Sequence, residues 1–497
     1  MFALLIFLSS THICKQPATM AEEHVKVKML CTSTVVPAVP TVKRSMFLSN
    51  LDLIWIPIAN SHSVLFYKTN PEMEFTTVTD MLKRSLSSVL VDFYPVAGRL
   101  STKASGETGR PEIDCNDGGV EFVEASIDMD IEDLEEDEFR HKSFFKELVP
   151  MRDGSKHENY DGPLFSVQVT GFRGGGICIG SSIHHVVADG SSFWHLMFCW
   201  AECCRGSPVS KKPEHMRTTF KREEKIDCAT TNISFSAEEV VINNIEGAQI
   251  FKFVRDDLLT KDVEINVSKS EADKRRLLEF ILKDQTEDLE ICSFHFNEEM
   301  IEKLKERAGT SSSFVAVSAH FWICVTRARE VPDNEPVGFG MSANSRGRVK
   351  PPLPPTFLGN CICMGFAQTT AKQLLGQDIR FAATLIKELI KSCSSEGQVD
   401  NLIDWVDCRL GSGSPLPSLA LEIIGGRYFV VAGNSPKFPV YELDYGWGKP
   451  LNAQIPTLNG VGAMMLFPGR DDGIDIHTRL PPRQMETLKQ ILMIIPD

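Results

Sequence analysis

The sequence lacks a long run of basic residues and a long run of apolar residues. Its 52 lysines and arginines are outnumbered by 66 aspartates and glutamates, so the formal net charge is −14 at pH 7. A protein that follows a phosphate backbone needs clustered basic side chains, so this balance argues against a nucleic-acid partner. The apolar run at residues 2–8 is far shorter than the roughly 20 residues of a membrane-spanning helix. No membrane span is therefore expected.

Metal-binding cysteine patterns are also missing. The chain has 14 cysteines, but they form no paired CxxC motif and no matching set of histidines and cysteines, which structural zinc sites require. Their irregular spread along a long chain is typical of a reduced intracellular protein and not of a disulfide framework. The cysteines therefore predict a cytoplasmic protein without a bound metal.

The first residues lack the charged start of a secretory signal, because the first lysine is Lys15. Met20, followed by one alanine and two glutamates, is typical of a cytosolic start. Our hypothesis is that residues 1–19 are a weak or spurious N-terminal extension. Either Met1 or Met20 is then the native start.

The chain of 497 residues is too long for one ordinary hydrophobic core, so two domains are expected. Residues 207–290 are charged and weakly periodic, which favours a crossover segment that carries some helices of its own. We therefore predict an N-terminal domain over residues 20–206 and a C-terminal domain over residues 291–497.

Hydrophobic periodicity predicts helices and strands in irregular alternation, and hence a mixed α/β sheet in each half. Glycine and proline punctuate these elements, and residues 468–473 have the composition of a hairpin turn. The predicted helices cover Val78–Phe93, Ser191–Arg205, Glu298–Ala308, Ser313–Arg329 and Pro481–Ile495, and the predicted strands cover Phe165–Val169, Ile177–Val186, Arg427–Ala432, Gly462–Phe467 and Gly473–Leu480.

The most informative segment, His185–Gly190, reads His-Val-Val-Ala-Asp-Gly. A predicted strand ends here before a predicted helix, so His185 can project into a cleft. The reference pKa of histidine lies near neutrality, so a neutral ring can take a proton from a hydroxyl or an amine and make it a nucleophile. Asp189 can cap the helix that begins near Ser191 or pair with an arginine. Taken alone, the pattern also fits a structural histidine, because the chain has 12 histidines.

A second segment, Asp444–Gly448, reads Asp-Tyr-Gly-Trp-Gly and contains no nucleophile–base pair of its own. Gly446 and Gly448 flank Trp447 and permit backbone angles that are closed to other residues. We interpret the segment as a rigid turn with one buried aromatic, which shapes a site without reacting in it.

Together these two segments resemble the HxxxD and DFGWG signature motifs of the plant BAHD acyltransferases. Tyr445 replaces the usual phenylalanine and adds a hydroxyl that needs a partner. Three further segments resemble family sequence in the same order, and the resemblance runs from about Leu48 to the C-terminus, weakest between residues 210 and 290. These segments are Leu48–Asp52, Phe93–Arg99 and Phe357–Cys361, the last with Leu358 as a departure from the usual pattern.

The resemblance implies two chloramphenicol-acetyltransferase-like domains of mixed α/β structure with a central channel between them. It implies an acyl-CoA co-substrate, a small-molecule acceptor, no metal, no permanently bound cofactor and no covalent enzyme intermediate, in a protein that we expect to be monomeric. His185 is then the catalytic general base, and the donor to the oxyanion is unassigned. The residues implied to be structural are Asp189, its partner Arg346 (with Arg348 as second choice), Asp444, Gly446, Trp447 and Gly448.

The substrate is less constrained by the sequence than the reaction. A hydroxycinnamoyl donor is our first expectation, with an aliphatic acyl donor of the cutin or wax type as the alternative, in plant secondary or cuticle-related metabolism. Lys437 matches a position where relatives acting on shikimate bind the acceptor carboxylate through arginine, although lysine lacks the bidentate fork. A plain surface lysine is an equal interpretation.

Two rival functions belong to different classes. One is a non-catalytic family member that binds acyl-CoA or a phenolic compound, against which stands the presence of both His185 and Asp189. The other is a carrier-protein condensation domain, which shares a His-His-x-x-x-Asp-Gly pattern. The Asp444–Gly448 segment and the lack of a carrier-domain sequence favour the plant family.

Overall fold

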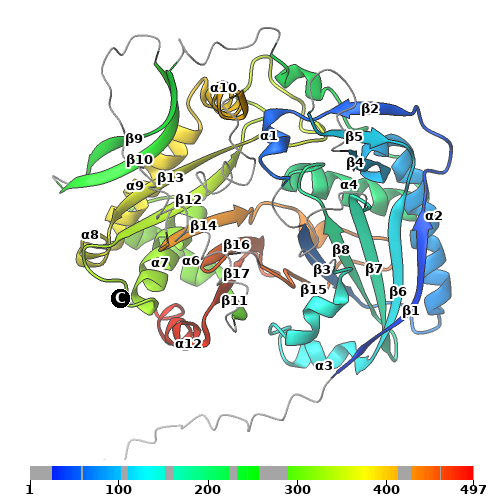
Figure 1. The fold of residues 1–497 in the computed structure, drawn as a ribbon. Helices are drawn as coiled ribbons and strands as arrows, with labels where there is room; N and C mark the ends of the chain where they lie inside the picture. Colours follow the sequence, from blue (N-terminus) through cyan, green and yellow to red (C-terminus); the bar gives the residue numbers. More distant parts are fainter. Residues whose placement is uncertain are drawn as a thin grey trace, which may run out of the picture.

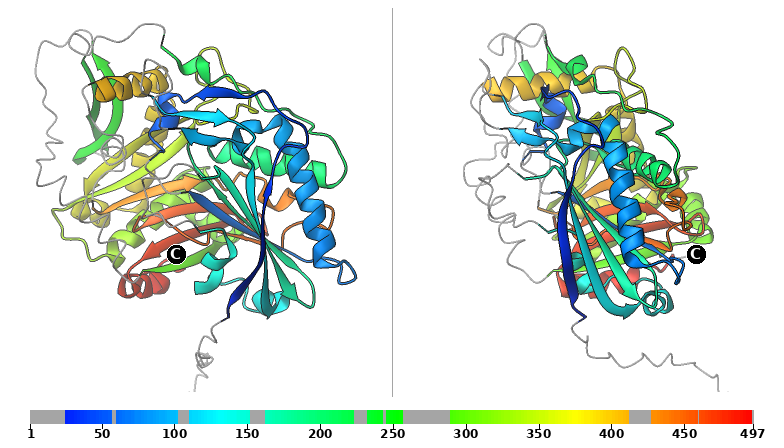
Figure 2. Two further views of the ribbon diagram at one scale, coloured as in Figure 1. Left: turned by 45° about the vertical axis from the view of Figure 1, so that its right-hand side comes forward. Right: turned by 90° about the vertical axis from the view of Figure 1, so that its right-hand side faces the viewer.

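The computed structural model describes residues 25–56, 60–101, 110–151, 162–222, 232–242, 245–256, 289–411, 427–458 and 460–495. Residues 1–19, for which an extension is hypothesised, lie outside this part of the chain. Two sheet-rich halves stand side by side, one from the first part of the sequence and one from the last (Figures 1 and 2). This arrangement agrees with the mixed α/β sheet that was predicted for each half.

The N-terminal half is built on a six-stranded sheet that is covered on one face by two mutually packed helices (Figure 2). The helices form because apolar residues recur every three or four positions, and Leu82, Leu86 and Val89 are fully buried. Both helices were predicted from this spacing. In sheet order the strands are β1 (Val27–Val35), β6 (Val120–Asp130), β7 (Phe165–Arg173), β8 (Ile177–Ile183), β3 (Ser61–Tyr67) and β15 (Asn452–Gln454), and the helices are α2 (Phe75–Asp92) and α4 (Gly190–Cys204).

Strand β15 belongs to the C-terminal part of the sequence but pairs with β3 in the N-terminal sheet. Asn452 lies opposite Phe66 and Gln454 opposite Val64 in an antiparallel register. A three-residue strand has too little periodicity to be recognised in the sequence, and it was not predicted. Its pairing ties the two halves together through backbone hydrogen bonds.

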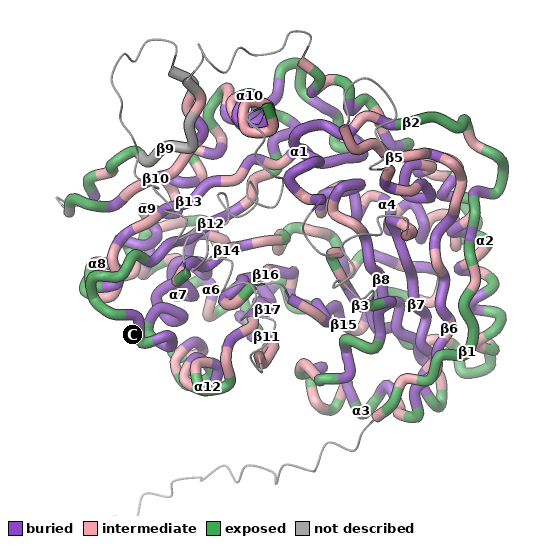
Figure 3. The backbone as a smooth tube through the Cα atoms, in the orientation of Figure 1, coloured by how far each residue is buried: buried purple, intermediate pink, exposed green. Residues whose placement is uncertain are grey.

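The C-terminal half contains an eight-stranded sheet whose apolar face is packed against helices (Figures 1 and 3). The predicted helices and strands of this half are present, and residues 469–473 connect β16 to its antiparallel neighbour β17. In sheet order the strands are β11 (Glu290–Phe296), β17 (Ile474–Leu480), β16 (Ala463–Pro468), β14 (Phe429–Asn434), β12 (Pro336–Asn344), β13 (Ile362–Thr370), β10 (Ile245–Asp256) and β9 (Asn232–Ile242), and the main helices are α6 (Glu298–Ala308), α7 (Ser313–Ala328), α9 (Ile379–Cys393), α10 (Gln398–Gly411) and α12 (Pro482–Ile491).

Part of the crossover segment forms strands that were not predicted. Strands β9 and β10 pair in an antiparallel register, and β10 also pairs with β13, so the two strands extend the C-terminal sheet. Ala248 and Ile250 are buried at alternate positions of β10, but the charged residues around them hide this alternation in the sequence. Residues 223–231 and 257–288 lie outside the described part of the chain, and the helices expected in this segment stay a prediction.

Two expectations about the environment of the protein can be compared with the described residues. No helix there has by itself the length and apolar composition of a membrane span, and only α6 and α7 taken together, bent by 81°, meet those criteria. Eleven described cysteines are free thiols, whereas Cys408 is disulfide-bonded. The irregular cysteine spacing did not predict that bond.

Gly180 in β8 offers a direct test of how tightly the sheet that leads to His185 is packed. A Cβ at this position would lie 1.9 Å from the carbonyl oxygen of Leu148, which is backbone and cannot rotate away. We expect Gly180→Ala to lower the free energy of unfolding by about 1–3 kcal/mol through overpacking, measured by chemical denaturation. Gly376→Ala is the matched control, because a Cβ there meets nothing within 4 Å. Equal stability of both variants would contradict the packing described for β8.

Candidate active site

His185 lies in the turn between β8 and α4, where the N-terminal half faces the C-terminal half. Strand β8 ends at Ile183, three residues before its predicted end, so His185 is in a turn and not in the strand. The half-buried imidazole stacks on Trp55 with ring centroids 3.9 Å apart and an angle of 13° between the rings. Its Nδ1 atom lies 3.0 Å from Oδ1 of Asn360, which belongs to the C-terminal half.

The surroundings of His185 favour a neutral ring. Burial lowers the pKa of His185 below the ordinary value of 6.5, because an imidazolium loses solvation in this position. The carboxylate of Asp189, a hydrogen bond with the backbone of His185 itself and the hydrogen bond with Asn360 oppose this shift but do not cancel it. At neutral pH the ring is therefore uncharged and able to accept a proton.

Asp189 caps α4 and pairs with an arginine at the same time. Its Oδ1 atom accepts a 3.0 Å hydrogen bond from the backbone N–H of Ser192 in the first turn of the helix. Nη1 of Arg346 lies 2.7 Å from Oδ2, and Nη2 lies 2.8 Å from Oδ1, so the contact is bidentate. Arg348 is exposed and donates instead to the carbonyl of Asn344. The sequence left the cap and the ion pair as alternatives, and the structure contains both.

This ion pair is almost completely buried, with 2% of Asp189 and 3% of Arg346 exposed. Burial alone raises the pKa of the Asp189 carboxyl, but Arg346 and the N–H groups of Ser192 and Cys361 outweigh it, and the pKa lies below its ordinary value. Removing one partner of such a pair leaves a buried charge and costs about 3–5 kcal/mol. The pair is a structural connection between the halves, and its carboxylate oxygens face Arg346 and backbone N–H groups.

A second buried network fixes the backbone around His185. Asp52, in the short helix α1 (Asn50–Leu53), lies 3.1 Å from Nη1 of Arg217 and accepts hydrogen bonds from the backbone N–H (3.0 Å) and Nδ2 (2.9 Å) of Asn360. Arg217 donates to the carbonyls of Val186 and Val187 at 3.1 and 2.5 Å. The turn that carries His185 is therefore held from both halves of the protein.

The Asp444–Gly448 segment forms the tight turn that was predicted. Oδ1 of Asp444 accepts from the N–H groups of Gly446 (2.7 Å) and Gly448 (2.9 Å), and both glycines have left-handed φ angles, 116° and 103°. Trp447 stacks on Tyr445, and both rings meet Tyr67 of β3 edge-on. The segment packs against the N-terminal sheet and holds its own shape by these contacts.

Tyr445 departs from the phenylalanine of the motif, and its hydroxyl has no hydrogen-bond partner among the described residues. The side chain is fully buried, and burial raises the pKa of this phenol well above its ordinary value. Tyr67, equally buried, donates its hydroxyl to the carbonyl of Leu443 at 3.2 Å. The two tyrosines therefore differ in whether the hydroxyl is satisfied.

We expect Tyr445→Phe to raise the free energy of unfolding by about 1 kcal/mol, because it removes a buried polar group that has no partner. Tyr67→Phe should lower it by a similar amount, because the Leu443 carbonyl is then left unpaired. Parallel denaturant titrations of both variants measure the difference. A destabilised Tyr445→Phe variant would contradict the unsatisfied state of this hydroxyl.

Lys437 is exposed in the turn that follows β14. The next residue, Phe438, packs on Gly190 at the start of α4, where a Cβ would lie 2.9 Å from its ring. Phe438 also approaches Trp194 of α4, with ring centroids 6.2 Å apart. The turn that bears Lys437 is thus packed against the helix that begins directly after the His185 segment.

Several residues of this site were not given a role from the sequence. Trp55 and Arg217 had no motif signal, because an isolated tryptophan and an isolated arginine are common in any chain of this length. Asn360 and Asp52 stood in segments that resemble the family, but the sequence did not indicate that they contact each other 308 positions apart. Only tertiary packing brings these side chains to His185.

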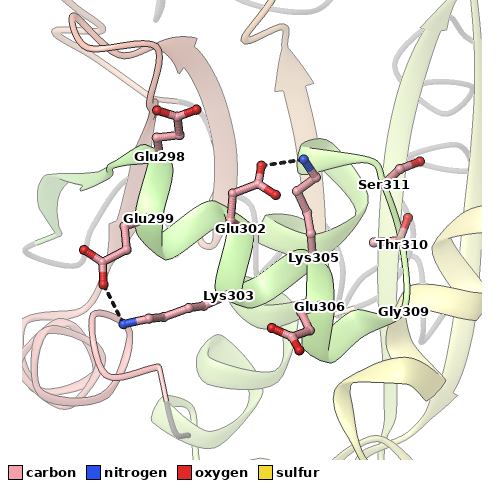
Figure 4. Close-up of a pocket in the computed structure, with 9 residues that line it drawn as sticks. All are labelled: Glu298, Glu299, Glu302, Lys303, Lys305, Glu306, Gly309, Thr310 and Ser311. Carbon is pink, nitrogen blue, oxygen red and sulfur yellow. Dashed lines mark hydrogen bonds and ion pairs between the residues drawn. The ribbon is translucent and has the colours of Figure 1, made fainter.

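One surface hollow lies elsewhere and involves none of the predicted site residues. It measures about 870 Å³ and follows the exposed face of α6 (Figure 4). Two of its glutamates form ion pairs along the helix, with Glu299 2.7 Å from Lys303 and Glu302 2.6 Å from Lys305. The hollow is an exposed helix face with an acidic excess, because its lining holds four glutamates and two lysines.

Comparison with solved structures defines the class of fold. The crystal structure of vinorine synthase superposes with a TM-score of 0.69 at 20% identity, covering 95% of this chain and 98% of that one. This likeness confirms the predicted class of fold, a mixed α/β architecture with two sheet-rich domains. The expected central channel stays a prediction.

The family is shown by sequence comparison. A family model described as the Transferase family matches residues 25–492, and the chain belongs to this family of BAHD acyltransferases. The BAHD acyltransferase DCR of Arabidopsis thaliana is 28% identical over 486 residues, covering 93% of this chain and 91% of its own. Hydroxycinnamoyl-CoA:piscidic acid hydroxycinnamoyltransferase of Actaea racemosa is 28% identical over 463 residues, covering 90% and 94%. The predicted class of enzyme, an acyl-CoA-dependent acyltransferase, is thereby confirmed.

Proposed function

We propose that this protein transfers an acyl group from a coenzyme A thioester directly to a hydroxyl or amine of a small-molecule acceptor, with His185 as general base. The observation that carries the proposal is the state of His185. Its ring is neutral, half-buried and fixed by one residue from each half of the protein, Trp55 and Asn360. A base held in this way at the junction of the halves can serve two substrates that enter together.

In the proposed reaction, Nε2 of His185 takes the proton from the acceptor as its oxygen or nitrogen attacks the thioester carbonyl. The tetrahedral intermediate then collapses, the bond between carbonyl carbon and sulfur breaks, and the imidazolium returns the proton to the thiolate of coenzyme A. Acyl-CoA is a co-substrate, and the reaction requires no metal, no permanently bound cofactor and no covalent enzyme intermediate. Holding both substrates in line lowers the entropic part of the barrier.

The remaining predicted residues receive positioning and structural roles in this proposal. Asp189 and Arg346 lock the loop after His185 to the C-terminal half, and the Asp444–Gly448 turn supports β3. We also propose that residues 20–206 and 291–497 are the two domains, with residues 207–290 as the crossover, and that the enzyme is a cytoplasmic monomer. The bidentate contact between Asp189 and Arg346 supports the structural role of these two residues.

For the substrates we propose a hydroxycinnamoyl donor and an acceptor that carries a carboxylate. The name of the relative from Actaea racemosa combines a hydroxycinnamoyl-CoA donor with an acid as acceptor. Lys437 lies in a turn that packs on Gly190, close in the chain to His185, and its ammonium group can attract a carboxylate. An aliphatic donor of the cutin or wax type remains the alternative.

The role of His185 is tested by substitution. We expect His185→Ala to lower kcat at least about 100-fold, the usual range for a lost general base, while the melting temperature and the Kd for coenzyme A change little. His184→Asn is the matched control, because its Oδ1 can replace Nδ1 of His184 as acceptor of the 3.2 Å bond from the N–H of Val186. Near-normal turnover of His185→Ala would refute the general-base assignment.

The substrate proposal is tested by a screen of donors against acceptors with mass-spectrometric detection of the product. We expect hydroxycinnamoyl-CoA thioesters to be used in preference to aliphatic ones, and Lys437→Ala to raise KM for an acidic acceptor with kcat nearly unchanged. Lys437→Arg should keep or lower that KM, because arginine offers a bidentate fork to a carboxylate. Preference for aliphatic donors would contradict the proposed hydroxycinnamoyl donor. A KM for the acidic acceptor that does not change in Lys437→Ala would contradict the proposed role of Lys437.

A further inference from the structure

We infer that Asn360 is a positioning residue that fixes the tautomer of His185, with the proton on Nδ1 and the lone pair on Nε2. The inference rests on the proposed role of His185 as general base. A neutral imidazole has two tautomers, and only the nitrogen without a proton can act as a base. The neighbour of the other nitrogen therefore decides which side of the ring is reactive.

The orientation of the Asn360 amide follows from its partners. Nδ2 lies 2.9 Å from Oδ1 of Asp52 and 2.8 Å from the backbone carbonyl oxygen of His185. An ionised carboxylate and a carbonyl can only accept hydrogen bonds, so both require the NH₂ end of the amide. The oxygen end must then face Nδ1 of His185, at 3.0 Å.

The amide cannot rotate without losing several hydrogen bonds in a dry site. Asn360 is fully buried, and its backbone N–H also donates to Asp52 at 3.0 Å. Asp52 is held in turn by Arg217 at 3.1 Å and by the N–H and hydroxyl of Ser49 at 2.9 and 2.7 Å. A flipped amide would place its oxygen against the Asp52 carboxylate, and such an unpaired buried acceptor costs about 1–3 kcal/mol.

The consequence for the ring is a fixed assignment of its two nitrogens. The oxygen of Asn360 can only accept, so Nδ1 of His185 must be the donor and carries the proton. Nε2 then has the lone pair and is the nitrogen left to act as base. When Nε2 accepts the acceptor's proton, Nδ1–H still donates to Asn360, so the hydrogen bond persists in the imidazolium and no proton leaves the Nδ1 side.

Asp189 does not perform this task, although it stands at the fixed spacing from His185. Both of its oxygens are engaged by Arg346 at 2.7 and 2.8 Å, and the N–H groups of Ser192 and Cys361 complete their hydrogen bonds at 3.0 and 3.1 Å. The neighbour of Nδ1 is a neutral amide and not a carboxylate. The amide orients the ring, whereas a carboxylate in its place would add a negative charge and raise the pKa of His185.

Two substitutions separate the tautomer from general stability. Asn360→Ala removes the side-chain acceptor of the Nδ1 proton. Asn360→Asp keeps one oxygen at that place but sets its second oxygen against the Asp52 carboxylate and the His185 carbonyl, so the stability of both variants is measured in parallel by denaturation. Asn401→Ala is the control for the loss of a structural amide. Asn401 lies in α10, and its Nδ2 donates to the carbonyl of Phe253 in β10 at 3.0 Å. Nitrogen-15 NMR of histidine-labelled enzyme, with the His185 signals assigned by their loss in His185→Ala, reports the tautomer directly.

We expect the wild-type spectrum above pH 7 to show His185 with a protonated Nδ1. In Asn360→Ala this signal should shift toward the Nε2–H tautomer, with kcat reduced at least about tenfold and KM for both substrates little changed, as for other lost supporting hydrogen bonds. Asn360→Asp should keep the Nδ1–H tautomer and more activity. Its added carboxylate raises the pKa of His185, so the acidic limb of the kcat/KM profile moves to higher pH, since the base works only when unprotonated.

A wild-type enzyme with the Nε2–H tautomer would overturn the inference, and so would an Asn360→Ala variant that keeps both the tautomer and kcat. If Asn360→Ala does not fold, the pH profile and tautomer of Asn360→Asp decide, and an unshifted acidic limb contradicts the inference. These outcomes differ from failure of the proposed function, in which His185→Ala itself retains turnover. Loss of activity in Asn401→Ala without loss of stability would also count against a specific role of Asn360.

Discussion

The architecture around the site depends on the buried ion pair between Asp189 and Arg346. One partner caps α4 in the N-terminal half, and the other follows β12 in the C-terminal half. Two desolvated charges are stabilising only when their geometry is good and their remaining hydrogen bonds are satisfied, and here the carboxylate receives four donors. Any relative shift of the halves would break several of these bonds at once, so the pair fixes their register.

The second network, Asp52 with Arg217 and Asn360, acts on the backbone and ring of His185 itself. It shares a feature with the first, because in both a carboxylate of the N-terminal half receives donors from the C-terminal half. The surroundings of His185 are thus built from two halves of the chain. A charged partner at Nδ1 would favour the imidazolium, whereas the amide of Asn360 orients the ring and leaves burial to lower the pKa.

The Asp444–Gly448 turn has a supporting role that its glycines explain. Both lie at left-handed φ angles, which let Asp444 accept two N–H groups of its own turn. The turn presents Tyr445 and Trp447 to β3 and precedes β15, which pairs with the free side of the same strand. The Asp444–Gly448 turn, the pairing of β15 with β3 and the Asp189–Arg346 ion pair therefore all connect the C-terminal part of the chain to the N-terminal half. The unsatisfied hydroxyl of Tyr445 is a local cost of the departure from phenylalanine.

The sequence by itself determined the regular elements and the reaction class. The spacing of Leu82, Leu86 and Val89 specified a helix because burial of one face requires that period, and the order of the motifs indicated the family. It could not specify β15, the β9–β10 hairpin or the contacts of Trp55 and Arg217, because these depend on partners far away in the chain. Only the tertiary structure decided that Asp189 faces Arg346 and that Asn360 faces Nδ1 of His185. Local periodicity records which side chains are buried, but hydrogen-bond direction is set by donors and acceptors that folding brings together.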